Sequence, residues 1–324
     1  MPAFNAGQWI AEALDSVLSQ THRAIEVVVA ENRSTDNTRE VVDRFKQAVR
    51  VVDAPIHGCG AARNAGLAVA QGDIIQWLDA DDVLEPWKIE RQLDQLLDSN
   101  ADIVWGPFWT YELAAGATVF QRRSRRVPAI GSDVVAGLLG ADGWVQMGAI
   151  LMRRGGALAT LRFEADHRVE DINYLIRAAF AGAKFVKSEA DSGLLFRQHS
   201  GQRASSVPNR LLALASADNA RLALRRWTER GELTPQRRDA VIDIFLFAAR
   251  GLFENDRESF LNVLGELRSL DPGFVRRLPT KLRIPSRVVG YQRTEWIATW
   301  VRGVAALLRS QRHVTVGGLK TRDL

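Results

Sequence analysis

Apolar residues in the first third of the chain form short β-branched runs, and segments of helical periodicity separate these runs. The runs predict strands over 25–30, 49–53, 73–82 and 101–106. Helices are predicted between them, over 37–47, 60–72 and 86–99. A continuous apolar run is typical of a strand that is buried on both faces. The alternation therefore predicts an α/β fold: a Rossmann-like, mostly parallel sheet with helices on both faces.

The pattern changes in the second half of the chain. One more helix and two strands are predicted, over 170–182, 184–187 and 193–198. Beyond residue 207 the strand pattern stops, and apolar residues recur at helical spacing. We therefore expect two domains: an α/β domain over 1–206 and a basic α-helical C-terminal region over 207–324.

Two basic segments stand apart from this pattern. The cluster RRSRR at 122–126 is predicted to be a solvated loop. Prolines divide a basic segment that is predicted to be a linker, at Pro272, Pro279 and Pro285. A last helix, predicted over 287–310, carries Trp296 and Trp300 on one side with Arg302 beside them.

Composition excludes several classes of protein. Hydrophobic residues make up 46% and charged residues 25% of the 324 residues, which is typical of globular domains and argues against disorder or fibrous repeats. The single cysteine, Cys59, excludes an internal disulfide or a multi-cysteine metal site. No apolar run reaches the length of a transmembrane helix, and MPAFNAGQWI lacks the regions of a signal peptide.

Charge is divided unevenly along the chain. Residues 1–200 carry 21 basic and 26 acidic side chains, whereas residues 201–324 carry 22 basic and 12 acidic ones. The first part can therefore hold a cation, and the second is suited to a negative surface. A nucleic-acid partner is not expected, because the basic residues are interspersed through amphipathic helices without a recognised motif.

Carboxylates follow the third predicted strand. In an open parallel sheet, ligands bind beyond the carboxyl ends of the strands. Asp79 and Asp81 are placed there, where a divalent metal such as Mn²⁺ or Mg²⁺ could join them to the phosphates of a ligand. The alternative is structural: Asp81 or Asp82 could cap the helix that begins near Pro86.

Other polar residues lie at predicted element boundaries. Arg63 and Asn64 open a helix after a glycine-rich turn, where Arg63 can pair with phosphate or a carboxylate. Glu170 and Asp171 open another helix, either as a general base or as complements to the helix dipole. His199 follows a strand, as a metal ligand or a structural residue.

The order of these segments resembles glycosyltransferase family 2. The segments that carry the resemblance are PAFNAGQWIAEALDSVLSQT, ENRSTDNT, GCGAARNAGLAVAQGDIIQWLDADD, VEDINYLIRAAFAGAKF and FRQHSGQRASS. The resemblance covers about residues 1–206. It implies a GT-A fold and transfer of a sugar, with inversion, from a nucleotide-diphosphate donor, with a UDP-sugar favoured.

The resemblance also implies roles for matching positions. Asp171 is the implied base that deprotonates the acceptor hydroxyl, with Glu170 as the second candidate. Metal ligands are implied at Asp81, Asp79 and His199. The implied nucleotide-sugar site comprises Pro2, Ala3, Asn5, Glu31, Asn32, Arg63, Asn64 and Asp79.

The chain departs from the family pattern in two places. Glu31, Asn32, Arg33 and Ser34 stand where Asp-Asp-Gly-Ser is usual. Asn32 can still hydrogen-bond a nucleotide base, since an amide both donates and accepts, while Arg33 predicts a differently shaped loop. The apolar strand usual before PAFN is missing, so we expect Met1 to be internal to a longer reading frame or the chain to be truncated.

Some partners follow from less specific features. Trp105, Trp109 and Trp144 are candidates for stacking on acceptor sugars, but for any one of them packing is the favoured explanation. The basic helices either dock on an anionic membrane near a lipid-linked acceptor or pack on the α/β domain.

We therefore expect a cytoplasmic enzyme, peripheral at the inner face of the plasma membrane, that acts on a glycan or lipid-linked acceptor in polysaccharide or cell-surface glycan synthesis. The alternative is a non-catalytic nucleotide-sugar-binding or scaffold protein with a degenerate site.

Overall fold

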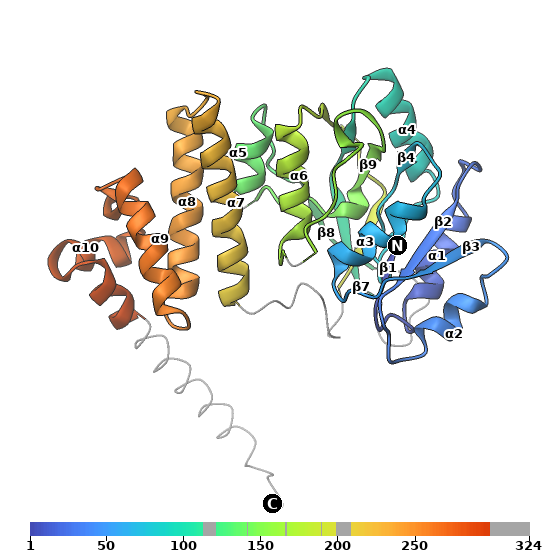
Figure 1. The fold of residues 1–324 in the computed structure, drawn as a ribbon, viewed down its shortest axis with the longest axis horizontal. Helices are drawn as coiled ribbons and strands as arrows, with labels where there is room; N and C mark the ends of the chain where they lie inside the picture. Colours follow the sequence, from blue (N-terminus) through green and yellow to red (C-terminus); the bar gives the residue numbers. More distant parts are fainter. Residues whose placement is uncertain (113–120, 141, 166, 189, 199–208, 299–324) are drawn as a thin grey trace, which may run out of the picture.

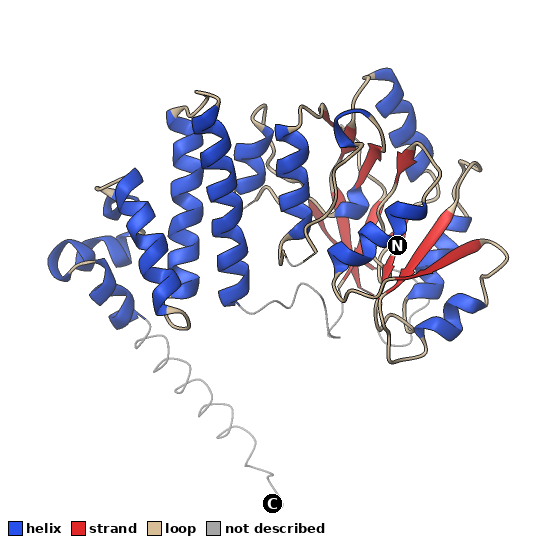
Figure 2. Cartoon of the chain, in the orientation of Figure 1, coloured by secondary structure: helices blue, strands red, loops and turns tan. Residues whose placement is uncertain are grey.

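The computed structural model describes residues 1–112, 121–140, 142–165, 167–188, 190–198 and 209–298. Strands and their covering helices make up one part of the molecule, and a row of helices extends from it toward the C-terminal end of the chain (Figure 1). The predicted α/β class and the helical C-terminal region are thus confirmed (Figure 2). The expected domain boundary at residue 206 lies outside the described residues.

The first sheet is parallel and has three strands. β2 (Val27–Glu31) lies between β1 (Pro2–Ala3) and β3 (Val49–Asp53). α1 (Ile10–Leu18) and α2 (Thr38–Asp43) contact each other, and α3 (Cys59–Val69) packs on all three strands. Small residues, Ala30 and Ala62, form the buried contact under α3, so the helix approaches the sheet closely. The expectation that Met1 is internal to a longer reading frame, or that the chain is truncated, stays a prediction.

The second sheet has the order β10-β6-β9-β4. Its strands are β4 (Ile74–Ile75), β6 (Ile103–Trp105), β9 (Ile150–Arg153) and β10 (Phe185–Lys187). β6 and β10 are parallel, whereas β9 runs antiparallel to β4 and β6. α4 (Lys88–Asp98) packs on β6 and β9. The strand predicted over 73–82 is much shorter, since β4 pairs with β9 only at Ile74 and Ile75. Directly after it, the Gln76 side chain donates to the Gly148 carbonyl at 3.0 Å.

The third sheet has the order β5-β11-β7-β8. It consists of β5 (Val83–Leu84), β7 (Phe108–Glu112), β8 (Gln121–Arg126) and β11 (Leu194–Arg197). The prediction of a solvated loop over 122–126 is wrong, since these residues form β8, antiparallel to β7. Charged side chains suit an edge strand, and here Arg122 pairs with Glu85 and Arg125 with Asp191.

The remaining regular elements of the described chain are helices. They are α5 (Val134–Leu139), α6 (Glu170–Phe180), α7 (Asn209–Glu229), α8 (Pro235–Leu252), α9 (Arg257–Leu270) and α10 (Thr280–Val289). Short 3-10 helices cover Met147–Ala149, Gly156–Leu158 and Phe274–Arg277. Two of the C-terminal helices have a side-chain cap at their N-terminus. Thr234, directly before Pro235, caps α8, and Asp256 caps α9, each by accepting a hydrogen bond from a backbone amide of the first turn.

The predicted linker is wrong in part, because α10 contains Pro285 and the 3-10 helix precedes it. Proline has no amide hydrogen, which is tolerated in the first turn of a helix. In the interior of a helix, proline bends the helix because a backbone hydrogen bond is lost and its ring clashes with the preceding turn. Residues 291–298 form another helical segment. Within the described residues, no helix is both long enough and apolar enough to span a bilayer.

Candidate functional site

Arg63 of α3 lies at the centre of a cluster of carboxylates. Its side chain is only 3% exposed and donates hydrogen bonds to Asp79 Oδ1 and Glu170 Oε1, each at 2.9 Å. Asp79 follows β4, and Glu170 begins α6, so the guanidinium joins three separate elements. The sequence placed these three residues in one site, and the structure brings them together.

Gln146 extends this cluster and was not predicted. Its side-chain amide is buried and donates to Asp79 Oδ2 at 3.1 Å and to Asp82 Oδ2 at 3.3 Å. Both oxygens of Asp79 are therefore already engaged, one by a cation and one by an amide. Gln146 lies more than 60 residues from the two aspartates, and no local sequence pattern connects them.

Arg197 also binds the loop that carries Asp79, Asp81 and Asp82, which we call the aspartate loop. The sequence did not predict this residue either. Its backbone amide donates to Asp82 Oδ1 at 2.9 Å, and its Nε donates to the Asp81 carbonyl at 2.8 Å. The buried guanidinium lies over the rings of Trp9 and Tyr111, at 4.5 and 4.8 Å from their centroids. The loop that carries Asp79 and Asp81 is thus tied to β11 by protein contacts.

Asp171 lies beside the cluster but has different partners. Oδ1 accepts a hydrogen bond from the Ile172 amide at 2.8 Å, and Oδ2 accepts one from Trp144 Nε1 at 3.4 Å. Burial and the neighbouring Glu170 carboxylate raise the pKa of Asp171 to about 6, against the opposing effect of Arg63. A carboxylate with such a pKa is suited to accept a proton near neutral pH.

Trp144 differs from the other two tryptophans that were considered for acceptor stacking. It is 39% exposed and rests edge-on against Phe108 and Phe196, with centroids 5.5 and 5.6 Å away. Trp105 is buried in the core, and Trp109 donates its indole N–H to Asp191. Only Trp144 among the three contacts the candidate base.

Asn32 is turned away from solvent and binds the backbone. Its amide nitrogen donates to the carbonyls of Ala54 and Ile56 at 2.8 and 2.7 Å, and its oxygen accepts from the Gly58 amide at 2.8 Å. Both amide hydrogens are used within the protein, so they are not available to a nucleotide base in this arrangement. Asn32 thereby shapes the loop that leads into α3.

Neighbouring loops are joined by further side chains of the predicted nucleotide site. Asn5 Oδ1 accepts from the Thr35 backbone amide at 2.8 Å. Ala3, which follows Pro2 in β1, accepts through its carbonyl from the Asn32 backbone amide at 2.8 Å. Glu31 accepts from the amides of Arg33 and Ser34. Arg33 has a φ of 66°, the left-handed conformation that favours glycine, and the Glu31 hydrogen bonds stabilise that turn.

Two aromatic side chains beside these loops were not predicted. Phe4 and His57 are both exposed and pack edge to face, with ring centroids 4.6 Å apart. They come from the segments after β1 and β3. An exposed aromatic pair at the end of two parallel strands offers apolar surface to a planar group.

Asn64 forms a reciprocal pair with the backbone of Phe163. Its amide nitrogen donates to the Phe163 carbonyl at 2.8 Å, and its oxygen accepts from the Phe163 amide at 2.9 Å. This pair ties α3 to the segment that precedes α6. A nucleotide-binding role for Asn64 stays a prediction.

The predicted metal ligands are only partly described. Asp79 lies in the Arg63 cluster, and Asp81 is half-buried in the adjoining loop. His199 lies outside the described residues. Among the residues that are described, no three His, Cys, Asp or Glu side chains are grouped so as to hold a metal. The two aspartates supply oxygen atoms suited to a hard cation, while its other ligands would come from elsewhere.

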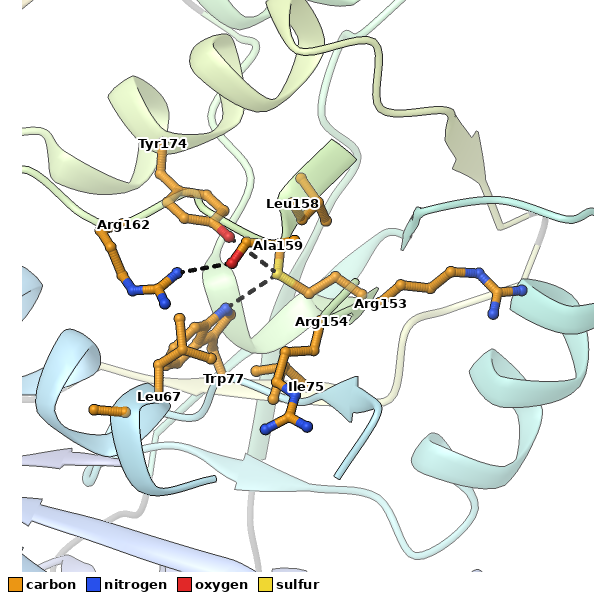
Figure 3. Close-up of a pocket in the computed structure, with 11 residues that line it drawn as sticks. Leu67, Ile75, Trp77, Arg153, Arg154, Leu158, Ala159, Arg162 and Tyr174 are labelled. Atoms are coloured by element: carbon orange, nitrogen blue, oxygen red, sulfur yellow. Dashed lines mark hydrogen bonds between the residues drawn. The ribbon is translucent and has the colours of Figure 1, made fainter. Parts of the chain in front are cut away.

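A cavity of about 350 Å³ lies close to the cluster but is separate from it. Trp77 and Tyr174 line it, and both direct their polar atoms at the sulfur of Met152 (Figure 3). None of the site carboxylates lines this cavity. Phe163 separates the cavity from the Arg63 guanidinium: one contact of its ring is with Tyr174, on which it stacks with centroids 4.3 Å apart, and another is with Arg63.

Comparison with known sequences gives a family match. The model of glycosyl transferase family 2 matches residues 1–167, more than half of the chain. Glycosyltransferase GlyG of Streptococcus pneumoniae is 33% identical over 124 residues, which cover 37% of this chain and 41% of GlyG. The matched region thus spans less than half of that relative.

Solved structures share the fold over most of the chain. S. aureus TarS 1-349 in complex with UDP-GlcNAc has a TM-score of 0.65 at 17% identity, covering 93% of this chain and 90% of that one. Mannosyltransferase PcManGT from Pyrobaculum calidifontis, in complex with GDP-Man and Mn²⁺, has a TM-score of 0.53 at 19% identity, covering 91% and 84%. The predicted GT-A-like fold is confirmed, and at these identities the likeness concerns the fold alone.

Arg63→Met should destabilise the protein by about 3 kcal/mol, because removing one partner of a buried ion pair leaves buried charge without compensation. Urea denaturation would measure the free energy of unfolding. Arg39→Met is the matched control, since Arg39 bridges Asp53 on an exposed surface and such bridges contribute about 0–1 kcal/mol. Equal losses in the two variants would contradict the central role of Arg63.

Proposed function

Because the chain belongs to glycosyltransferase family 2, we propose that it transfers a sugar from a nucleotide-diphosphate donor to an acceptor hydroxyl, with inversion at the anomeric carbon. The observation that carries this proposal is that two neighbouring acids, Glu170 and Asp171, have different electrostatic surroundings. Glu170 is neutralised by Arg63, whereas its neighbour Asp171 is held near a pKa of 6 and forms no salt bridge with any other described residue. Environments that separate two neighbouring carboxylates in this way are typical of acid–base sites.

Asp171 acts as the base in this proposal. One of its carboxylate oxygens takes the proton from the acceptor hydroxyl while the hydroxyl oxygen bonds to the anomeric carbon. The bond from that carbon to the donor diphosphate breaks with its electron pair, which leaves on the nucleotide. The Ile172 amide and the Trp144 indole each take one lone pair of Asp171 and orient it, so another lone pair on each oxygen stays available to the acceptor.

The donor occupies the edge formed by the segments after β1, β2 and β3 in this proposal. Asn5, Glu31 and Asn32 act by ordering that edge, since each binds the neighbouring backbone. Phe4 and His57 then provide the surface for the nucleotide base. Arg63 keeps the acids that flank the diphosphate in fixed positions.

The metal requirement belongs to the same proposal. Mn²⁺ or Mg²⁺, when bound, would neutralise the charge that develops on the leaving diphosphate. Asp81 and Asp79 would hold it, with His199 as a further ligand. Asp79 keeps one lone pair on each oxygen beside its hydrogen bonds to Arg63 and Gln146, so it fits this role chemically.

Substrate and location are proposed more broadly. UDP-hexoses are the first donors to test, and GDP-sugars follow, because proteins of the same fold bind UDP-GlcNAc and GDP-Man. The acceptor is a glycan or lipid-linked hydroxyl of polysaccharide or cell-surface glycan synthesis. The enzyme works in the cytoplasm, at an anionic membrane surface.

Asp171→Asn should lower the rate of sugar transfer by about 10²–10⁴-fold, the usual contribution of a general base, with nearly unchanged nucleotide affinity. Transfer is measured with a panel of nucleotide sugars, and affinity by calorimetry. Glu164→Gln removes an exposed carboxylate of the same region and should have no effect. Retained turnover would exclude Asp171 as base, and donor binding without any wild-type turnover would favour the non-catalytic alternative.

The pH dependence of transfer should report Asp171. The base works only when deprotonated, so kcat/KM for the acceptor should fall about tenfold per pH unit below pH 6. The Trp144 hydrogen bond lowers the pKa of Asp171, so Trp144→Phe should move this fall to higher pH. Trp87→Phe should leave the profile unchanged. A profile that is flat from pH 5 to 8, or that Trp144→Phe does not move, would refute the assignment.

Asp81→Asn should weaken the binding of UDP in the presence of Mn²⁺ and leave the binding without metal unchanged, because it removes a charged ligand of the metal. Calorimetric titrations with and without Mn²⁺ compare the two conditions. Asp94→Asn, at an exposed position of α4, serves as the control. Identical isotherms for Asp81→Asn and the wild type would rule out metal binding by Asp81.

A further inference from the structure

The last described helices expose the side chains that surface helices ordinarily bury. α10 buries Leu282 and Ser286 but exposes Ile284 by 60% and Val288 by 81%. A helix on the surface of a soluble domain normally directs its apolar side inward. Ile284 and Val288 are four residues apart, so they lie on one face of the helix, and that face is directed to solvent.

The helical segment 291–298 shows the same inversion more strongly. Thr294 and Glu295 are only 2% and 1% exposed, whereas Trp296 is 64% exposed. The orientation is fixed by Glu295, which pairs with Arg250 of α8 at 3.5 Å. Tyr291 adds an edge-to-face contact with Phe274, with centroids 5.3 Å apart. The side that carries Tyr291, Thr294 and Glu295 is thus the anchored side, and among the described residues nothing covers Trp296 and Ile297, which are 64% and 44% exposed.

We name the outward side of α10 and 291–298 the C-terminal apolar surface. Its apolar members are Ile284, Val288, Val289, Trp296 and Ile297. Its exposed basic members are Lys281, Arg287 and Arg293, which form no ion pair within the described part of the chain. The one acid of the segment 280–298, Glu295, is buried. The surface therefore combines exposed apolar side chains with uncompensated positive charge.

Charge distinguishes among the possible occupants of this surface. A second copy would bring the same positive side chains against themselves, and like charges at an interface oppose association. Residues 299–324 carry five basic and one acidic side chain, so charge disfavours them as well. An apolar face with tryptophan, flanked by lysine and arginine, is the composition that binds the interface of an anionic bilayer.

We propose that the C-terminal apolar surface binds anionic lipid membranes. Ile284, Val288 and Trp296 enter the boundary between headgroups and acyl chains, while Lys281 and Arg287 face the lipid phosphates. This identifies the surface that carries the membrane contact, and it holds whether or not the chain transfers sugar. The contact is peripheral, because these side chains come from short helices that lie along the surface of the protein.

Co-sedimentation of the full chain with vesicles tests this proposal. The protein should bind vesicles that contain phosphatidylglycerol and bind much less to phosphatidylcholine alone, and high salt should weaken the binding. Arg287→Gln should lower the partition coefficient about fivefold, because each basic residue near such a surface adds about that factor. Val288→Ser and Trp296→Ser should each lower it about tenfold or more.

Matched controls lie on other elements. Leu97→Ser removes an exposed apolar side chain from α4, and Arg44→Gln removes an exposed basic one after α2. Both should bind vesicles like the wild type. Equal binding to both kinds of vesicle, no binding, or equal losses in the controls would overturn the proposal. So would wild-type self-association in sedimentation experiments that Val288→Ser abolishes, since the occupant would then be a second copy. The vesicle experiment contains no sugar donor or acceptor, so its outcome is independent of whether the proposed transfer reaction is found.

Discussion

The guanidinium of Arg63 is withdrawn from water, and a buried cation without a partner costs several kcal/mol. It must therefore be neutralised where it lies, by Asp79 after β4 and by Glu170 at the start of α6. This requirement fixes α3, the aspartate loop and α6 relative to one another. It also gives the two acids at the start of α6 different surroundings, since Glu170 takes the salt bridge and Asp171 keeps a raised pKa. The acid–base chemistry that we propose depends on that difference.

The loops around this centre use polar side chains to bind backbone. Asn32 satisfies three backbone groups of the segment 54–58, and Asn64 satisfies two of Phe163. An amide that is committed in this way cannot also discriminate a nucleotide base without breaking those bonds. Base selection in the proposed site then depends on main-chain groups and on the exposed rings of Phe4 and His57, which favour a planar group but distinguish poorly between bases.

The strands and helices that the sequence predicted correctly are those whose position depends on the local pattern of apolar residues. The strands over 49–53 and 185–187 and the helix that begins at Glu170 lie close to where periodicity placed them. Gln146 and Arg197 were missed because each reaches the aspartate loop from a distant part of the chain. The strand at 122–126 was missed because arginines are poor indicators of a strand. They are compatible with one here because β8 is an edge strand, and two of its arginines, Arg122 and Arg125, pair with acids on neighbouring elements.

Positive charge in the helical region serves two different purposes. Some arginines attach the helices to the α/β part: Arg237 pairs with Asp133 at 2.6 Å, and Arg230 donates to the Phe180 carbonyl at 2.7 Å. Others stabilise the helices among themselves, as Arg221 does with Glu266. Lys281, Arg287 and Arg293 form no ion pair with the residues that the structure describes, and they lie beside the exposed apolar side chains of the C-terminal apolar surface. A polar anchor such as Glu295 is costly to bury. Binding of the C-terminal apolar surface to a membrane, as proposed, would remove from water the apolar side chains that this orientation exposes.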